Sequence, residues 1–354
     1  MLTELEDKKF RKVYREFKRT PNAHSDINSI CEILDRNFGT DNYNVQNTNI
    51  TAAMRGLEGY SINFESFSLF FPNKSVFLKK QVFVKDLGKT FNEAETILPP
   101  YLQMQFLIKT ARLIETEKTQ AKKAEVVGEA LSREFNLDAL ADLSVELYPK
   151  FKALENSHIQ IRETVETYAM GLYRSAISTL IPCIENAIRE LGKRLGLDEP
   201  ENVSANYLIN IIDSSAKKYI RDYVYRDFDW VPQEVLSKDF FLNFDERVQI
   251  MLNCKSYIEN HLYMNTTSYE GITNLNRHSV VHGFMSNYHH QANYIRLINL
   301  LNGICFMLTF SGENISLFFP SPSNKSKQFL KNLYNLHSIG LYRSKFLDDN
   351  CIER

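Results

Sequence analysis

An arginine and two histidines lie close together in LNRHSVVHG, the stretch from Leu275 to Gly283. Residues four apart share one face of a helix, so His278 and His282 would point the same way if this stretch is helical. Arg277, five residues before His282, has a side chain long enough to swing toward that face. A guanidinium binds phosphate through paired hydrogen bonds, and histidine transfers protons near neutral pH. The spacing therefore predicts phosphate chemistry, with Arg277 and His282 as the main catalytic residues and His278 as a further candidate.

An arginine five residues before a histidine is weak evidence by itself. The same spacing runs from Arg19 to His24, but Pro21 lies between them and tends to break a continuing helix, so we reject that pair as a site. On spacing alone, the favoured interpretation of Arg277 and His282 is a surface or partly buried pair that merely stabilises a helix.

The strongest helical pattern in the chain covers residues 155–197, upstream of this stretch. Apolar residues recur there at spacings of three and four, the mark of a buried stripe: Ile177, Leu180, Ile181, Ile184, Ile188, Leu191 and Leu195. Pro182 predicts a kink in this helix, and Gly196 predicts its end. A second helix, over about residues 244–262, leads into the stretch, and an apolar helix over about residues 294–310 follows it.

The N-terminal part predicts further helices and a few strands. Residues 1–20 read as a basic amphipathic helix, either packed by its aromatic side or touching RNA or a membrane. A second helix ends at Gly39, and residues 40–49 read as a polar loop. Residues 60–85, rich in Phe and Val, predict a hairpin or two short strands.

Three more helices are expected, over residues 101–123, 125–135 and 137–147, and Tyr148-Pro149 is a plausible domain boundary. The predicted fold class is mainly α. The predicted domains are a mostly helical N-terminal regulatory or recognition domain at 1–149, a catalytic domain at 150–310 and an appended segment at 311–354.

Composition and charge are those of an ordinary globular protein. The 354 residues are 44% hydrophobic and 24% charged, with 42 basic and 43 acidic side chains and a formal net charge of -1. Nucleic-acid binding would therefore need a local basic patch. The five cysteines are scattered without a CxxC pair, which argues against disulfides and structural zinc. No signal peptide or membrane span is evident, so we expect a cytoplasmic protein with no membrane partner.

The stretch LNRHSVVHG resembles the motif of the HEPN (higher eukaryotes and prokaryotes nucleotide-binding) superfamily. In that family an arginine, usually followed by a polar residue, precedes a histidine by five positions, as Arg277, His278 and His282 do here. Asparagine is the most frequent residue after the arginine, and His278 departs from this. The family's helical core also carries an earlier E-x3-[KR] pattern, which Glu185 and Arg189 match.

This resemblance covers residues 150–310 and implies a helical bundle that cleaves RNA without a metal or another cofactor. In that chemistry an RNA 2′-OH attacks the adjacent phosphate and leaves a 2′,3′-cyclic phosphate and a 5′-OH. His282 would act as general base or acid, Arg277 would stabilise the charge on phosphorus, and His278 would position the phosphate or carry the second proton. We expect Glu185, Arg189 and Asn276 to support these residues.

Members of the family commonly form homodimers in which two motifs face one cleft, so a homodimer is implied here. By the same analogy the protein would be a toxin or phage-defence (abortive-infection) effector that cuts tRNA or other cellular RNA. Two alternatives stay open: a non-catalytic HEPN module that binds a nucleotide or a partner protein, and a helical scaffold in which Arg277 and His282 are structural.

Other polar clusters give weaker signals. Tyr288, His289 and His290 could form an RNA-binding rim in which the tyrosine stacks on a base, although a solvated loop is the simpler interpretation. A metal site built from His282, His289 and His290 has no accompanying carboxylate pattern, and we predict no metal. The phosphate-binding and nucleophile motifs GxxxxGK[ST], GxGxxG and GxSxG are all missing from the sequence.

Overall fold

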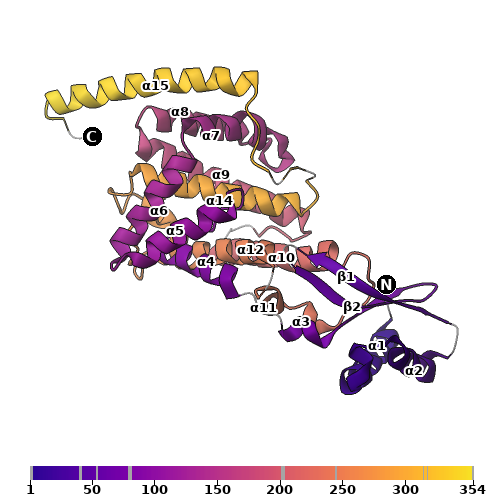
Figure 1. Ribbon diagram of the computed structural model, residues 1–354. Coiled ribbons are helices and arrows are strands. Elements are labelled where there is room, and N and C mark those ends of the chain that lie inside the picture. Colours follow the sequence, from indigo (N-terminus) through magenta and orange to yellow (C-terminus); the bar gives the residue numbers. More distant parts are fainter. Residues whose placement is uncertain are drawn as a thin grey trace. The chain divides into compact units, whose positions relative to one another are not determined.

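The computed structural model describes residues 3–39, 42–52, 55–78, 82–200, 204–243, 245–313, 315–316 and 318–352 (Figure 1). The predicted fold class is confirmed, because these residues are mainly α-helical with one small antiparallel sheet. They form two compact units. Unit 1 joins Met1–Lys85 to Ala216–Gln249, and unit 2 joins Asp86–Ser215 to Ile250–Arg354. The predicted boundary at residue 149 falls inside unit 2, and residues 311–354 belong to that unit.

The sheet of unit 1 has three strands in the order β1 (Asn44–Ala52), β2 (Arg55–Asn63) and β3 (Ser68–Pro72), each antiparallel to its neighbour. A hairpin was expected only at 60–85, and its β2–β3 part is confirmed. The polar loop predicted at 40–49 is wrong from Asn44 onward, because β1 occupies those residues.

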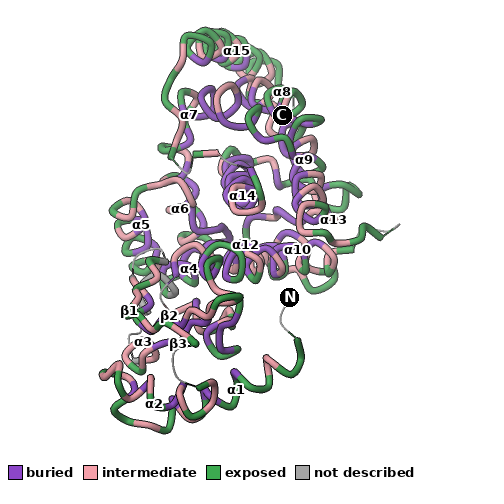
Figure 2. The backbone as a smooth tube through the Cα atoms, turned by 90° about the vertical axis from the view of Figure 1, so that its right-hand side faces the viewer, coloured by how far each residue is buried: buried purple, intermediate pink, exposed green. Residues whose placement is uncertain are grey.

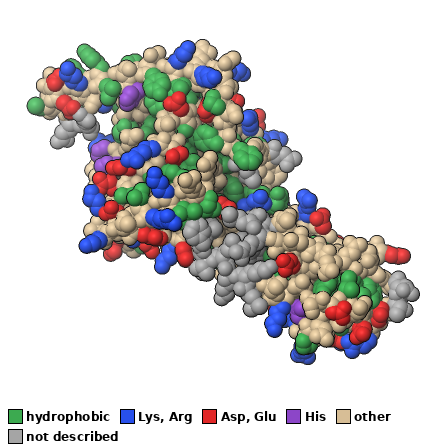
Figure 3. All heavy atoms as spheres, viewed as in Figure 1, with side chains coloured by type: hydrophobic (Ala, Val, Ile, Leu, Met, Phe, Trp, Pro, Cys, Tyr) green, Lys and Arg blue, Asp and Glu red, His purple; other side chains and the backbone are tan. Residues whose placement is uncertain are grey.

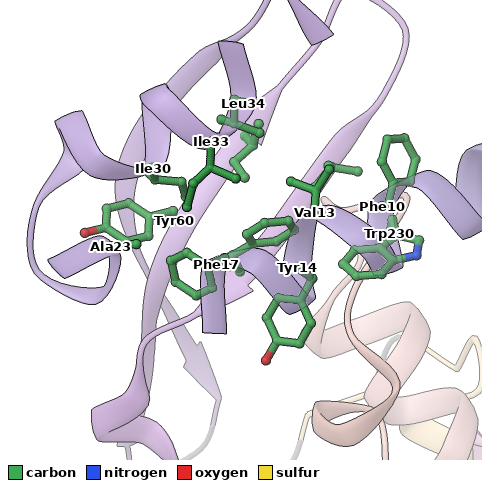
Figure 4. Close-up of a cluster of buried hydrophobic side chains, with 13 residues drawn as sticks. Phe10, Val13, Tyr14, Phe17, Ala23, Ile30, Ile33, Leu34, Tyr60 and Trp230 are labelled. Carbon is green, nitrogen blue, oxygen red and sulfur yellow. The ribbon is translucent and has the colours of Figure 1, made fainter. Parts of the chain in front are cut away.

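Aromatic side chains form the core of unit 1. They come from helix α1 (Glu4–Arg19), from β2 and β3, and from Trp230 (Figure 4). Phe10, Val13, Tyr14 and Phe17 are the buried residues of α1, so this helix is packed by its aromatic side. Trp230 enters the unit through the backbone, since its carbonyl accepts from Phe70 N at 3.0 Å and its N–H donates to the carbonyl of Ser68 at 3.1 Å. These contacts explain why a distant segment belongs to this unit.

Three of the remaining helices, α4, α10 and α12, run from one unit into the other along the chain. Their bounds are α2 Ile27–Phe38, α3 Lys74–Leu78, α4 Val82–Glu93, α5 Met104–Thr116, α6 Gln120–Glu134, α7 Leu137–Asp142, α8 His158–Ala169, α9 Tyr173–Arg194, α10 Ala205–Lys218, α11 Lys238–Phe241, α12 Glu246–Tyr257, α13 Arg277–Val281, α14 Gln291–Thr309 and α15 Asn324–Asp349. Short π-helical turns extend α7, α10 and α12.

Helix α14 lies at the centre of unit 2, where Figure 2 shows it coloured as buried among its neighbours. Every residue from 293 to 308 is buried, as an apolar helix packed on all sides requires. Its polar residues are bonded inside the core: Asn299 Nδ2 donates to the carbonyl of Ile97 at 2.9 Å, and Asn302 Oδ1 accepts from Tyr148 Oη at 2.9 Å. Helices α9 and α6 pack against α14, and α8 packs against α9.

Several predicted helix bounds are corrected. The single helix expected over 101–123 is two helices, because α5 ends at Thr116 and Thr119 caps α6 by accepting from Lys122 N at 3.3 Å. Pro182 lies within α9, and Gly196 ends that helix region with a φ of +72°. The C-terminal segment contains one 26-residue helix, α15, which packs on α7 and α8.

Positive and negative side chains are interspersed over the face seen in Figure 3, in keeping with the balanced composition. All five cysteines are free thiols. Across the described ranges, no helix combines the length and the apolar character that crossing a bilayer demands.

Candidate active site around Arg277, His278 and His282

Helix α13 carries the predicted catalytic residues and begins at a buried cap. Asn276 is fully buried, and its Oδ1 accepts from Ser279 N at 3.1 Å and from Ser279 Oγ at 3.3 Å. Its Nδ2 donates to the carbonyls of Met264 at 2.8 Å and His261 at 3.3 Å. One amide group therefore starts α13 and ties it to the preceding segment, which fixes where Arg277 begins.

The loop before α13 is held by two buried side chains that the sequence did not single out. Glu95 accepts from the N–H groups of Ile272 at 2.6 Å and Thr273 at 3.1 Å, and from Thr273 Oγ1 at 2.6 Å. Asn293, in the first turn of α14, donates through Nδ2 to the carbonyls of Thr273 at 2.7 Å and Tyr288 at 2.9 Å. The segment that contains α13 is thus anchored on both sides.

Arg277 forms an ion pair with Glu185 of α9, ninety-two positions earlier in the chain. Arg277 Nε lies 2.7 Å from Glu185 Oε1, and both side chains are mostly buried. This hydrogen bond and the charge of Glu185 raise the pKa of Arg277 above its usual value, against the effect of burial. A guanidinium has five N–H donors, so bonding through Nε leaves donors on the terminal nitrogens for a further anion.

Tyr263 is a site residue that sequence reasoning missed. Its hydroxyl donates to the same Glu185 Oε1, and the edge of its ring faces His278 with ring centroids 6.3 Å apart. Burial and the neighbouring Glu185 charge raise the pKa of Tyr263 well above 10, so the hydroxyl stays protonated and serves as a donor. No spacing rule connects Tyr263 to Glu185, because the two meet only in the folded chain.

The imidazoles of His278 and His282 share one face, as predicted. Their rings are almost parallel, 7° apart, with centroids separated by 6.2 Å. Helix α13 is only five residues long, so His282 lies at its C-cap and Gly283 follows with a φ of +72°. His278 is half-buried and His282 is exposed.

The spacing predicted that the Arg277 guanidinium swings toward the His282 imidazole, and the structure does not show this. Among the described residues no hydrogen bond joins Arg277 to His282, because Arg277 turns to Glu185. His278 follows Arg277 in the chain, and its ring lies beside that of His282. These contacts and the ion pair to Glu185 connect Glu185, Arg277, His278 and His282 as a row.

Arg189, the second residue of the E-x3-R pattern, lies outside this row. Its Nη1 is 3.5 Å from Glu199 Oε1, and its Nη2 donates to Asn186 Oδ1 at 3.4 Å. The pattern therefore contributes Glu185 to the site, while Arg189 pairs elsewhere on α9.

The predicted RNA-binding rim is only partly available. Tyr288 is 8% exposed, and its hydroxyl lies 3.2 Å from Ser178 Oγ, so its ring offers no free face for stacking on a base. That predicted role is wrong. The rings of His289 and His290 stack on each other with centroids 5.6 Å apart, and His290 occupies the N-cap position of α14.

No family model, curated protein or solved structure matches this chain. In the described part of the chain, no group of three His, Cys, Asp or Glu side chains is arranged to hold a metal ion.

The pKa of His278 is lowered below 6.5, first by burial and then by the positive charges of Arg277 and His282, while Glu185 opposes the shift. We expect its NMR titration midpoint to lie below 6.5 and to rise in Arg277→Ala, which removes a repelling charge. Because the folded pKa is the lower one, its contribution to stability is present above pH 6.5 and is lost as the pH falls through that midpoint. Loss of the resonance in His278→Gln assigns it, and a midpoint at or above 6.5 would contradict the prediction.

Proposed function

We propose that this protein is a metal-independent endoribonuclease. One observation carries the proposal: an arginine anchored by a mostly buried carboxylate lies on the same five-residue helix as an imidazole, with a second, parallel imidazole whose ring centroid is 6.2 Å from the first. Cleaving RNA through its 2′-OH needs a proton acceptor, a proton donor and a cation near the phosphate, and nothing else from the protein. The row supplies all three from its own side chains.

In the proposed reaction the 2′-oxygen attacks phosphorus while its proton moves to a neutral imidazole. The bond from phosphorus to the 5′-oxygen breaks, and a protonated imidazole gives that oxygen a proton, which leaves a 2′,3′-cyclic phosphate and a 5′-OH. His278 suits the acceptor role, because its lowered pKa keeps it neutral at pH 7. His282 is then the donor, and the terminal nitrogens of Arg277 bind the phosphate oxygens.

The likeness to HEPN proteins noted above extends the proposal to cellular targets. It favours tRNA or another cellular RNA as substrate, a homodimer as the working form and a role as a toxin or phage-defence effector. Two parallel imidazoles within one chain mean that a protomer carries both an acid and a base, so the dimer is not needed to complete the chemistry.

The test is cleavage of a single-ribonucleotide oligonucleotide by the purified protein in EDTA. We expect cleavage 3′ to the ribonucleotide, a 2′,3′-cyclic phosphate end, and no cleavage of the all-deoxy oligonucleotide. His282→Ala should cut about 100-fold more slowly or worse, the range typical for loss of a general acid or base. His158→Ala, a histidine at the start of α8, is the matched control and should keep full activity.

Equal cleavage by wild type and a folded His282→Ala protein would refute the catalytic assignment. If neither RNA is cut while a nucleotide raises the melting temperature, the binding-module alternative is supported instead.

A further inference from the structure

A pocket lies in unit 2 between α6 and the start of α14. It has a volume of about 480 Å³ and is lined by α6, by the loop at Ile272 and Thr273, and by the first turn of α14. Small-molecule sites range from roughly 300 to 1,000 Å³, so the pocket is large enough for a small metabolite. Its lining includes Arg296, which is 3% exposed.

Arg296 is a buried cation without an anionic partner. Its Nη1 donates to Asn293 Oδ1 at 3.2 Å and its Nη2 to the carbonyl of Ala124 at 2.6 Å, and both acceptors are neutral. Its Nε has no partner, and among the described residues no carboxylate lies within ion-pair distance of the guanidinium. Buried charges in proteins are normally paired, because removing them from water is costly.

Glu95 does not form an ion pair with Arg296. Burial lowers the pKa of Arg296, and Tyr257, then Glu95, oppose this shift in part. The Glu95 carboxylate is already bonded to the N–H groups of Ile272 and Thr273. The guanidinium therefore lies next to an open pocket without a carboxylate of the described residues bonded to it.

The N-terminus of α14 is a second positively polarised group that lines the same pocket. Its cap residue His290 makes no side-chain capping bond, and in the described structure the N–H groups of Gln291 and Ala292 have no acceptor. Such first-turn N–H groups on a long helix attract anions. Gln291, Ala292 and Arg296 all line the pocket.

The acidic residues that line the pocket do not cancel this charge. Glu125 Oε2 is 2.6 Å from Lys122 Nζ, and Glu129 Oε2 is 3.3 Å from Arg133 Nη2, both on exposed turns of α6. Gly128 faces the guanidinium, and a Cβ there would lie 2.8 Å from Ala292 Cβ and 3.6 Å from each terminal nitrogen of Arg296. The glycine therefore keeps α6 and α14 close without covering the cation.

We propose that this pocket binds a small phosphate monoester, with its phosphate at the first turn of α14 beside Arg296. A dianionic phosphate matches one guanidinium and a helix N-terminus, and the remaining volume accommodates the organic part. This site is separate from the row at α13, and the inference does not depend on RNA cleavage.

The test is calorimetric titration of the full chain with ribose 5-phosphate at constant ionic strength, with ribose as the uncharged comparison. We expect saturable binding of the phosphate and none of ribose. Arg296→Met should weaken binding at least tenfold. Ala292→Asp places a carboxylate in the anion position at a helix start, where it is tolerated, and should abolish binding even if Arg296→Met fails to fold.

Arg162→Ala removes an exposed arginine of α8 and should bind like the wild type. No heat of binding with the wild type, or unchanged affinity in a folded Ala292→Asp protein, would overturn the proposal. Equal binding of ribose would overturn it as well, because the phosphate would then contribute nothing.

Discussion

Replacing Arg277 by alanine is expected to slow RNA cleavage by roughly 1,000-fold, within the range measured when a preorganised donor or arginine is removed from a developing negative charge. Phosphorus gains negative charge as the 2′-oxygen attacks, and Arg277 is the only cation in the row that does not need to exchange protons during the reaction. Single-turnover cleavage of the single-ribonucleotide oligonucleotide measures the chemical step directly.

Two further variants, Arg277→Lys and Glu185→Ala, distinguish the effect of the Arg277 charge on cleavage from the effect of its position. Arg277→Lys keeps the charge but cannot bond to Glu185 through Nε while also presenting two terminal donors, so it should remain strongly impaired. Glu185→Ala should impair cleavage through Arg277, and the double variant should then be no slower than Arg277→Ala alone. Independent, multiplying effects of the two changes would show that Glu185 does not act by positioning Arg277.

Asn276→Ala is expected to lower the free energy of unfolding by about 2–4 kcal/mol. The estimate combines the loss of a helix cap, about 0.5–2 kcal/mol, with the cost of leaving a buried polar group unpaired, about 1–3 kcal/mol. The carbonyls of Met264 and His261 lose their donor, and Ser279 N loses its acceptor. Urea unfolding followed by circular dichroism measures the change.

Ser279→Ala is the matched comparison, since it removes only the longer contact to Asn276 Oδ1, at 3.3 Å, and keeps the cap. Its effect should stay within about 1 kcal/mol, the net value of an ordinary hydrogen bond. If Asn276→Ala were no more destabilising than Ser279→Ala, the cap would not be what holds α13.

Helices with a strong apolar period were predictable, and a polar strand was not. The stripes of α9 and α14 are visible in the sequence because burial selects residues at spacings of three and four. Strand β1 pairs with β2 on one side only, and most of its residues are exposed or half-buried. Backbone hydrogen bonds hold it to the sheet, so its sequence reads as a loop.

The division into two units could not be predicted from the sequence, for a different reason. Unit 1 is built from segments more than a hundred residues apart, joined where β3 pairs with the backbone at Trp230. A boundary predicted from local sequence separates contiguous domains. Tyr148-Pro149 was predicted as such a boundary, although both residues lie within unit 2. Local composition carries no information about such a long-range pairing.

Most of the candidate site followed from spacing and resemblance, and the remainder needed the fold. Arg277, His278, His282 and Glu185 were named in advance, and the structure places them in one row. Tyr263 and Glu95 act through tertiary contacts with no fixed spacing. Tyr288 was misassigned because an aromatic residue in a polar segment resembles a surface residue until its partner, Ser178, is known.

The side chain of Asn293 affects how the segment that contains α13 can open. Its side-chain amide bonds to the carbonyls of Thr273 and Tyr288, so it closes the chain between them, with α13 inside, into a loop. Glu95 and the Asn276 cap hold the same segment at further points. The loop would open as a local unfolding unit only if these hydrogen bonds and those of Asn293 broke together, while α9 and α14 stay folded. Such an opening would move Arg277 away from Glu185, which remains on α9.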